Sequence, residues 1–158
     1  MMQKEPRVVH SAAEVLDAGV NLESIQFFNL QAVINEETDG QANLPAEVTP
    51  VYGLKLRQEG NEIGTRVSIE LDTGAARIIA DASANYSTDE LIELDEAAFL
   101  DFANNVGVMA LLPYLRQAIA DLSQRVLGDV ILMPVIPRGG LVFSRADAMP
   151  PGFESATT

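Results

Sequence analysis

Residues that carry covalent chemistry are few in this chain, and none of them stands in a catalytic spacing. The 158 residues include one histidine, His10 in a polar segment, and no cysteine, so the sequence offers neither a nucleophile with a histidine base nor a thiolate metal site. Gly139-Gly140 lacks the lysine of a phosphate-binding loop and favours a turn. Carboxylates such as Glu36-Glu37 and Asp95-Glu96 are spread over expected loops and polar faces. An acid–base pair of carboxylates is left open, but the sequence predicts no enzyme, no metal site and no cofactor.

The charge balance is strongly acidic. The chain has 10 lysines and arginines against 23 aspartates and glutamates, which gives a net charge of -13 at pH 7. Such a charge repels phosphate backbones and attracts basic polypeptides, so it argues against nucleic acid as a direct partner. The N-terminal segment lacks the apolar core of a signal peptide, and no uninterrupted apolar run approaches the roughly 20 residues that span a bilayer. We therefore expect a cytoplasmic protein without membrane insertion.

Four segments alternate between apolar and polar residues, which is the pattern of half-buried β-strands. The turns at residues 59–61 and 72–74 are short and contain glycine, so the strands that they join are antiparallel. The sequence therefore predicts a four-stranded antiparallel sheet with one apolar and one polar face. The expected strands cover residues 24–34, 51–58, 63–71 and 76–86. In the first of them, Phe28, Leu30, Ala32 and Ile34 are expected on one face, and Phe27, Asn29, Gln31 and Val33 on the other.

A long helix is expected to cover the apolar face of this sheet. Apolar residues recur at spacings of three and four between Phe99 and Val126. Polar residues 87–90 offer capping groups before the helix, and Gly128 suits the left-handed position that ends many helices. The helix begins near Leu94 or after Asn105, because the asparagines and the glycine around residue 105 weaken the pattern.

The most distinctive stretch, residues 111–135, joins the second half of this helix to an extended apolar run. Pro113 lies inside the helix, where proline removes a backbone donor, costs roughly 3 kcal/mol and is expected to cause a kink. The N-terminal residues either form a frayed surface arm or pack a short helix on the body. The expected division is an arm over 1–22, one domain over 23–143 and an irregular tail over 144–158.

Three fragments of this chain resemble the SecB family of export chaperones. Leu112-Pro113-Tyr114 with Arg116 is similar to the (F/L)-P-Y-x-R segment of the family's main helix. Leu132-Met133-Pro134-Val135 is similar to the L-x-P-V end of the strand that follows, and Phe28-Asn29-Leu30-Gln31 to the F-x-I-Q opening. The fragments occur in the family's order over residues 24–143. The resemblance implies the SecB-like α+β fold, a four-stranded antiparallel sheet packed on a long kinked helix.

The resemblance also implies a homotetramer, a dimer of dimers with sheets outside and long helices packed between subunits. The residues agree with self-association, because one sheet leaves the helix apolar on more than its sheet-facing side. A monomer whose N-terminal arm covers the helix is the alternative. The positions expected at the oligomer interface are Ala110, Leu111 and Ala118.

SecB-like proteins hold unfolded polypeptides, without ATP, in apolar grooves formed by the first connecting loop, the helix and the C-terminal region. Adaptable apolar contact with backbone hydrogen bonding tolerates many client sequences, and methionine suits such a surface. The alternative for each matching position is burial in the core or in a subunit interface. The positions that would contact clients are Leu44, Pro45, Val48, Met133, Val135, Ile136, Leu141, Val142 and Phe143.

The chain departs from the export members of the family in two ways. Prolines and glycines interrupt the region where those members carry a second amphipathic helix. Export members also dock the motor SecA through acidic residues on the sheet face, for which Glu37 and Asp81 are the nearest equivalents. The longer arm and proline-rich tail are more similar to SecB-like chaperones of toxin–antitoxin systems, which bind an aggregation-prone antitoxin.

The sequence thus favours an ATP-independent holdase for unfolded polypeptides, acting in protein export with SecA or in folding of an antitoxin. The competing hypothesis is an oligomeric structural or assembly protein of a mobile element. A holdase binds generic unfolded chains, whereas an assembly protein has one dedicated partner. Competition with an unrelated unfolded protein separates these two functions.

Overall fold

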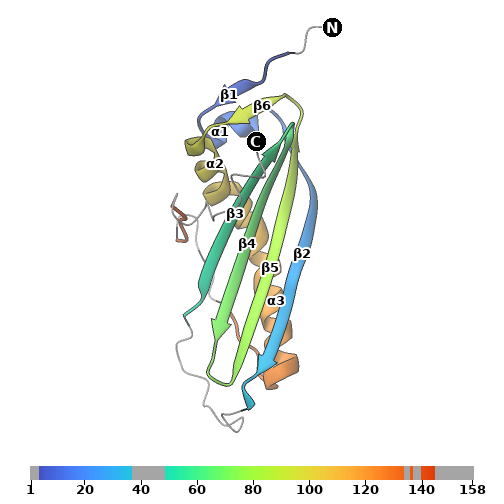
Figure 1. Ribbon diagram of the computed structural model, residues 1–158, viewed down its shortest axis with the longest axis vertical. Helices are drawn as coiled ribbons and strands as arrows, with labels where there is room; N and C mark the ends of the chain where they lie inside the picture. Colours follow the sequence, from blue (N-terminus) through green and yellow to red (C-terminus); the bar gives the residue numbers. More distant parts are fainter. Residues whose placement is uncertain (1–3, 37–48, 134–135, 137–139, 145–158) are drawn as a thin grey trace.

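The main element of the fold is a four-stranded antiparallel sheet in the order β2-β5-β4-β3. The computed structural model describes residues 4–36, 49–133, 136 and 140–144. A long helix lies across one face of the sheet, and a group of short elements lies at one end of it (Figure 1). The four strands and the helix predicted from the sequence are confirmed. The strands are β2 (Val20–Ile34), β3 (Val51–Glu59), β4 (Glu62–Asp72) and β5 (Ala76–Thr88).

Two tight turns join β3, β4 and β5. Gly60 and Gly74 have φ angles of 59° and 79°, in the left-handed region that glycine adopts without a steric penalty. In the second turn the Asp72 carboxylate accepts a hydrogen bond of 2.9 Å from the Gly74 amide. Thr73 Oγ1 accepts another of 2.9 Å from the amide of Ala76. These local bonds hold the antiparallel register between β4 and β5.

Strand β2 does not follow the simple alternation predicted for it. Its register against β5 shifts between Phe27 and Asn29, as it does where a bulge inserts one extra residue. An extra residue reverses the face that the following side chains take. Phe27 lies opposite Ala82 and shares its inner, helix-facing side, whereas Phe28 lies under the guanidinium of Arg66 on the outer face. The prediction that grouped Phe28 with the later apolar residues of this strand, and placed Phe27 opposite them, is wrong for this reason.

The helix runs without a break from Glu96 to Leu127. It comprises α2 (Glu96–Phe102), a π-helical turn (Ala103–Gly107) and α3 (Val108–Leu127). The Asp95 side chain caps its start by accepting a 2.8 Å hydrogen bond from the Ala98 amide. Gly128, with φ of 72°, ends it as predicted, and Pro113 lies inside α3 without interrupting the helix. The two possible starting points are thereby resolved in favour of the earlier one, with the asparagines placed in the π-helical turn.

The helix approaches the sheet closely at Gly107. A Cβ atom at this position would lie 2.4 Å from Thr65 Oγ1 and 2.8 Å from Thr65 Cβ. Thr65 is fully buried on β4, in the middle of the sheet, and its Cβ is fixed by the strand backbone. Glycine is therefore needed at residue 107 to let the helix and sheet come together.

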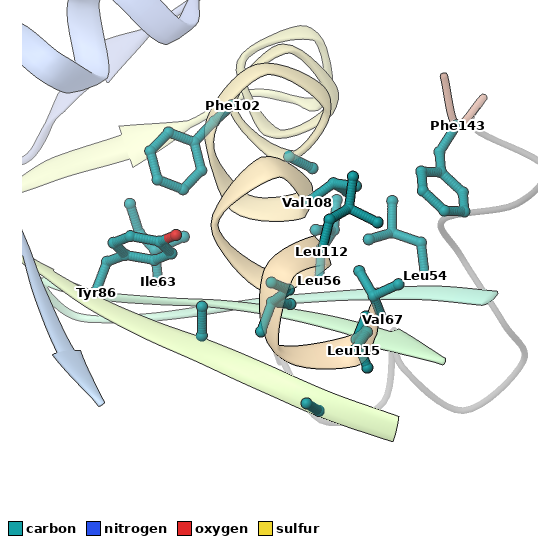
Figure 2. Close-up of a cluster of buried hydrophobic side chains, with 14 of the residues drawn as sticks. Leu54, Leu56, Ile63, Val67, Tyr86, Phe102, Val108, Leu112, Leu115 and Phe143 are labelled. Atoms are coloured by element: carbon teal, nitrogen blue, oxygen red, sulfur yellow. The ribbon is translucent and has the colours of Figure 1, made fainter. Parts of the chain in front are cut away.

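A core of aliphatic and aromatic side chains fills the space between helix and sheet (Figure 2). The Phe102 ring is fully buried and meets the Tyr86 ring edge-on, with 5.1 Å between ring centroids. Burial raises the pKa of Tyr86 to about 12. No described residue hydrogen-bonds to the Tyr86 hydroxyl. The contribution of Tyr86 to the core therefore comes from its ring.

Residues 7–17 near the N-terminus are part of the folded body. Strand β1 (Arg7–Val9) pairs in parallel with β6 (Ile92–Leu94), and α1 (Ala12–Asp17) packs against α2. Val9 and Val15 are fully buried. The structure therefore shows the second of the two alternatives for this segment, a short helix packed on the body, and not a frayed arm. Burial of these valines against the first turns of the long helix is the physical reason.

His10 is expected to titrate above the ordinary range of histidine. Its Nδ1 is hydrogen-bonded to the carboxylate of Asp95. This hydrogen bond and the attraction between the two opposite charges raise the pKa of His10 and lower the pKa of Asp95. A raised histidine pKa stabilises the fold below the unfolded-state pKa, and this contribution is lost as pH rises through the folded-state pKa. The lowered carboxylate pKa acts in the other direction, so its contribution is lost as pH falls through the folded-state pKa of Asp95.

An NMR titration of the His10 ring protons would measure this pKa. The matched variant is Asp95→Asn, since asparagine also caps helices but carries no charge. The His10 pKa should fall toward 6.5 in that variant, the ordinary histidine pKa from which Asp95 raises it. An unchanged pKa in Asp95→Asn would show that the pair does not form in solution.

Candidate functional site

The chain after the helix turns back along α3. The amide of Ile131 donates a 2.8 Å hydrogen bond to Ser123 Oγ, which is fully buried on the helix. Met133 is buried a little further along. Between this segment and the exposed side of α3 lies a shallow hollow of about 250 Å³, lined by Pro113, Arg116, Gln117, Ala120, Leu132 and Met133. The proline and the leucine–methionine pair of the sequence motifs therefore lie together at one hollow.

A second part of the C-terminal region packs near the start of the helix, at the edge of the sheet formed by β3. Phe143 is 5% exposed, and its ring points toward Leu54 of β3 and Leu112 of α3 (Figure 2). The side-chain amide of Asn104 holds its backbone, because Nδ2 donates to the Phe143 carbonyl at 3.0 Å and Oδ1 accepts from the Phe143 amide at 2.8 Å. We call this arrangement the Asn104–Phe143 clamp.

The structure brings some of the predicted client-binding positions onto this side of the molecule. Met133 and Phe143 are buried within the chain, Ile136 and Leu141 pack half-buried against the core, and Val142 is 65% exposed. Burial of Met133 and Phe143 means that a client reaches these side chains only where the segment moves. The other four predicted positions, Leu44, Pro45, Val48 and Val135, lie outside the described residues.

An apolar stripe on β2 is exposed on the same side of the sheet as the helix. Helix α3 packs over β5, β2 and β4, but several β2 side chains on this face stay about half exposed. Four of these side chains form the stripe, and the alternation pattern did not predict that they would stay exposed beside the helix. They are Leu22 (51% exposed), Phe27 (38%), Leu30 (50%) and Ile34 (47%). A contiguous apolar surface of this kind on a sheet edge is typical of an interaction site.

The predicted oligomer positions on the helix fall into two classes. Leu111 is fully buried inside the single chain, because it faces the sheet, and it offers no surface to a second copy. The prediction that Leu111 lies at a subunit interface is therefore wrong. Ala110 and Ala118 are half-buried and pack at the edge of the core, so part of each remains on the surface.

The outer face of the sheet carries cations as well as acids. Asp81 receives two hydrogen bonds from the guanidinium of Arg66, at 2.8 and 2.9 Å, and these bonds raise the pKa of Arg66. Arg66, Lys55 and Arg57 line a hollow of about 550 Å³ on this face, together with Glu23 and Glu62. Asp81 is thus paired with its neighbour, and its role in docking a partner stays a prediction. Glu37, the other expected docking residue, lies outside the described residues.

The helix Glu96–Leu127 is long and apolar enough to cross a membrane, judged by length and composition alone. In the structure its apolar residues Leu111, Leu115 and Ile119 are fully buried against the sheet. Core helices of globular proteins pass the same test of length and composition. The helix is therefore only weak evidence for a membrane span.

Comparison with solved structures identifies the fold. A SecB-like chaperone of Mycobacterium tuberculosis, Rv1957, solved in complex with a ChAD peptide from the Rv1956 HigA1 antitoxin, matches with a TM-score of 0.63. The match covers 80% of this chain and 97% of that chain, at 15% sequence identity. The chain has the SecB-like fold. No protein-family model matches the sequence.

A sequence relative points the same way. The SecB-like chaperone SmegB of Mycolicibacterium smegmatis is 29% identical over 80 residues. These residues are 51% of this chain and 55% of that protein, so the matched part spans about half the length of the relative. The resemblance to SecB-like chaperones that the sequence motifs indicated is confirmed in sequence and in fold.

Proposed function

We propose that this chain is an ATP-independent chaperone that holds unfolded or aggregation-prone polypeptides, and that an antitoxin of a toxin–antitoxin system is among its clients. The observation that carries the proposal is the SecB-like fold over 80% of the chain. The M. tuberculosis protein with this fold was solved with a peptide from an antitoxin, which supports an antitoxin as the client here. The relative SmegB is itself a SecB-like chaperone.

The described surface suits such a role. The C-terminal segment beside α3 places apolar side chains and main-chain groups within reach of an extended polypeptide. Apolar contact combined with main-chain hydrogen bonding holds many sequences, because it reads little of the client's side-chain identity. The net charge of -13 attracts clients with basic segments and speeds their capture at low ionic strength.

The antitoxin role is favoured over export through SecA. The solved complex of the M. tuberculosis protein with an antitoxin peptide supports this preference. Of the two acidic residues expected to dock SecA, Asp81 is paired with Arg66. We also propose that the chain acts in the cytoplasm, where a newly made antitoxin is met. Self-association into a homotetramer completes the proposal, with the β2 stripe as a surface that a second copy would cover.

A light-scattering assay tests the holdase function. Reduction of insulin releases its aggregating B chain, and the purified protein should suppress this aggregation at near-stoichiometric ratios with no nucleotide present. Native mass spectrometry of the same sample should show tetramers. An unrelated acidic globular protein at equal concentration serves as the control. A monomer without any effect on scattering would contradict the proposal.

A further inference from the structure

We propose that the Asn104–Phe143 clamp is a peptide-binding site, filled in this structure by the chain's own C-terminal segment. Its ligand is an extended polypeptide segment that presents an aromatic side chain, and such a segment enters by displacing Phe143. The inference rests on the proposed binding of unfolded polypeptides and assigns one site for it. It also changes the role of Phe143 from the client contact expected from the sequence to a competitor of the client.

The geometry of the clamp is that of main-chain recognition. Asn104 bonds to both the carbonyl and the amide of one residue, at 3.0 and 2.8 Å. A neighbouring antiparallel strand makes the same exchange of two bonds with a residue in a hydrogen-bonded pair. Neither bond involves the side chain of residue 143, so the amide of Asn104 would hold any extended residue in this place.

The apolar part of the site accepts one ring. Phe143 is 5% exposed between β3 and the helix, where its ring points toward Leu54 and Leu112 (Figure 2). The flanking side chain of Val142 is 65% exposed and points away from the core. The described segment, residues 140–144, belongs to no helix or strand. The Phe143 ring, the half-buried Leu141 side chain and the pair of bonds to Asn104 hold it in place, and another segment with an aromatic side chain and an extended backbone can take the same position.

The position of Asn104 in the helix agrees with a binding role. Asparagine is a poor residue for a helix interior, and Asn104 stands in the π-helical turn Ala103–Gly107. Single π-helical turns within α-helices are frequent at functional sites. Here the Asn104 side chain, which stands in this turn, hydrogen-bonds to the C-terminal segment and does not cap its own helix.

Peptide binding to the full-length protein tests the inference. The probe is a fluorescently labelled peptide with the sequence Gly-Leu-Val-Phe-Ser of residues 140–144, followed by fluorescence anisotropy. Phe143→Ala should bind the probe about tenfold more tightly than the wild type, as expected if the chain's own segment fills the site about nine-tenths of the time. Val142→Ala is the matched control on the same segment and should bind as the wild type does. A probe with alanine in place of phenylalanine should bind at least tenfold more weakly.

A second substitution separates binding from packing. Asn104→Ala in the Phe143→Ala background should lose roughly the tenfold that was gained, because the client loses both main-chain bonds. If Phe143 is only a core residue, Phe143→Ala lowers the melting temperature and leaves probe affinity unchanged. If Phe143 contacts the client directly, Phe143→Ala weakens probe binding. Either result overturns the proposal.

Hydrogen exchange on the wild-type protein provides a measurement that needs no variant. Saturating probe should speed exchange of the Phe143 amide by up to about tenfold, the limit set by nine-tenths occupancy, because the displaced segment loses its bond to Asn104. Unchanged exchange under saturating probe would show that the peptide binds elsewhere. The insulin assay tests the holdase function independently of this site. If the protein binds the probe but does not suppress insulin aggregation, the peptide-binding site is supported and the holdase function is contradicted.

Discussion

Replacing Leu30 with aspartate is expected to raise the dissociation constant for self-association by roughly a hundredfold or more. Leu30 lies in the middle of the exposed β2 stripe, on the inner face of the sheet, opposite Ala80. Covering the exposed half of one leucine is worth about 0.8–1.5 kcal/mol, and a symmetric interface contains the residue twice. Placing an aspartate charge at both positions adds a desolvation cost of at least about 1 kcal/mol, so the total of about 3 kcal/mol or more corresponds to about a hundredfold in affinity. Sedimentation velocity over a range of concentrations measures the change.

Val33→Asp is the matched control for this prediction. Val33 is 52% exposed on the same strand, close to the 50% of Leu30, but it lies on the outer face opposite Arg77. Its substitution should leave assembly near the wild-type level. Equal loss in both variants would indicate that subunits join through the strand edge and not through the inner stripe. Full assembly of Leu30→Asp would show that the stripe is not an interface.

The hairpins of this fold could be predicted from the sequence because their determinants are local. The side chains of β4 and β5 alternate between an inner, mostly apolar face and an outer, mostly polar face, and glycines at 60 and 74 mark their turns. Both strands have neighbours on each side, so a slip of one residue would bury the polar set. The side-chain pattern is therefore sufficient to predict these two strands and the turns that join them.

The face assignment of β2 could not be predicted in the same way. β2 is an edge strand that pairs only with β5, and an extra residue near Phe28 is tolerated there. Both Phe27 and Phe28 are apolar, so hydrophobicity does not tell which of them points inward. The bulge follows from pairing with a strand that lies some 50 residues later, which local alternation does not record.

The candidate site was predicted only in part for a related reason. The spacing of apolar residues on the helix does not say how wide a strip the sheet covers, so Leu111 was placed at an interface although it is buried. Asn104 was noted only as a weakness in the helix. Its role depends on Phe143 folding back from 39 positions further along the chain. A short-range pattern gives no signal for such a contact.

The two edges of the sheet differ in what covers the core. At the β3 edge, Phe143 closes the space between strand and helix, held by Asn104. At the β2 edge the inner apolar stripe stays exposed. This asymmetry supports two separate binding surfaces. The β2 edge would bind another copy of the chain, and the β3 edge, closed by the C-terminal segment, would bind clients. The Leu30→Asp and Phe143→Ala variants address one edge each.

Phe102→Ala is expected to lower the free energy of unfolding by about 3–5 kcal/mol, the usual cost of deleting a fully buried phenylalanine. Part of the loss, about 0.5–1.5 kcal/mol, comes from the edge-on contact with Tyr86. Domains are stable by about 5–15 kcal/mol, so this one change removes a large share of the total. Urea denaturation followed by circular dichroism measures it.

Tyr86→Phe is the control on the other side of the same contact. It keeps the ring and removes a buried hydroxyl that no described residue bonds, so stability should stay the same or rise slightly. A loss of less than about 1 kcal/mol in Phe102→Ala would mean that the helix shifts to fill the space. Asn104 stands two residues after Phe102, so even a small shift would move the clamp, and faster exchange of the Phe143 amide in Phe102→Ala would reveal it. The aromatic contact that fixes the helix on the sheet thus also sets the position from which Asn104 holds the C-terminal segment.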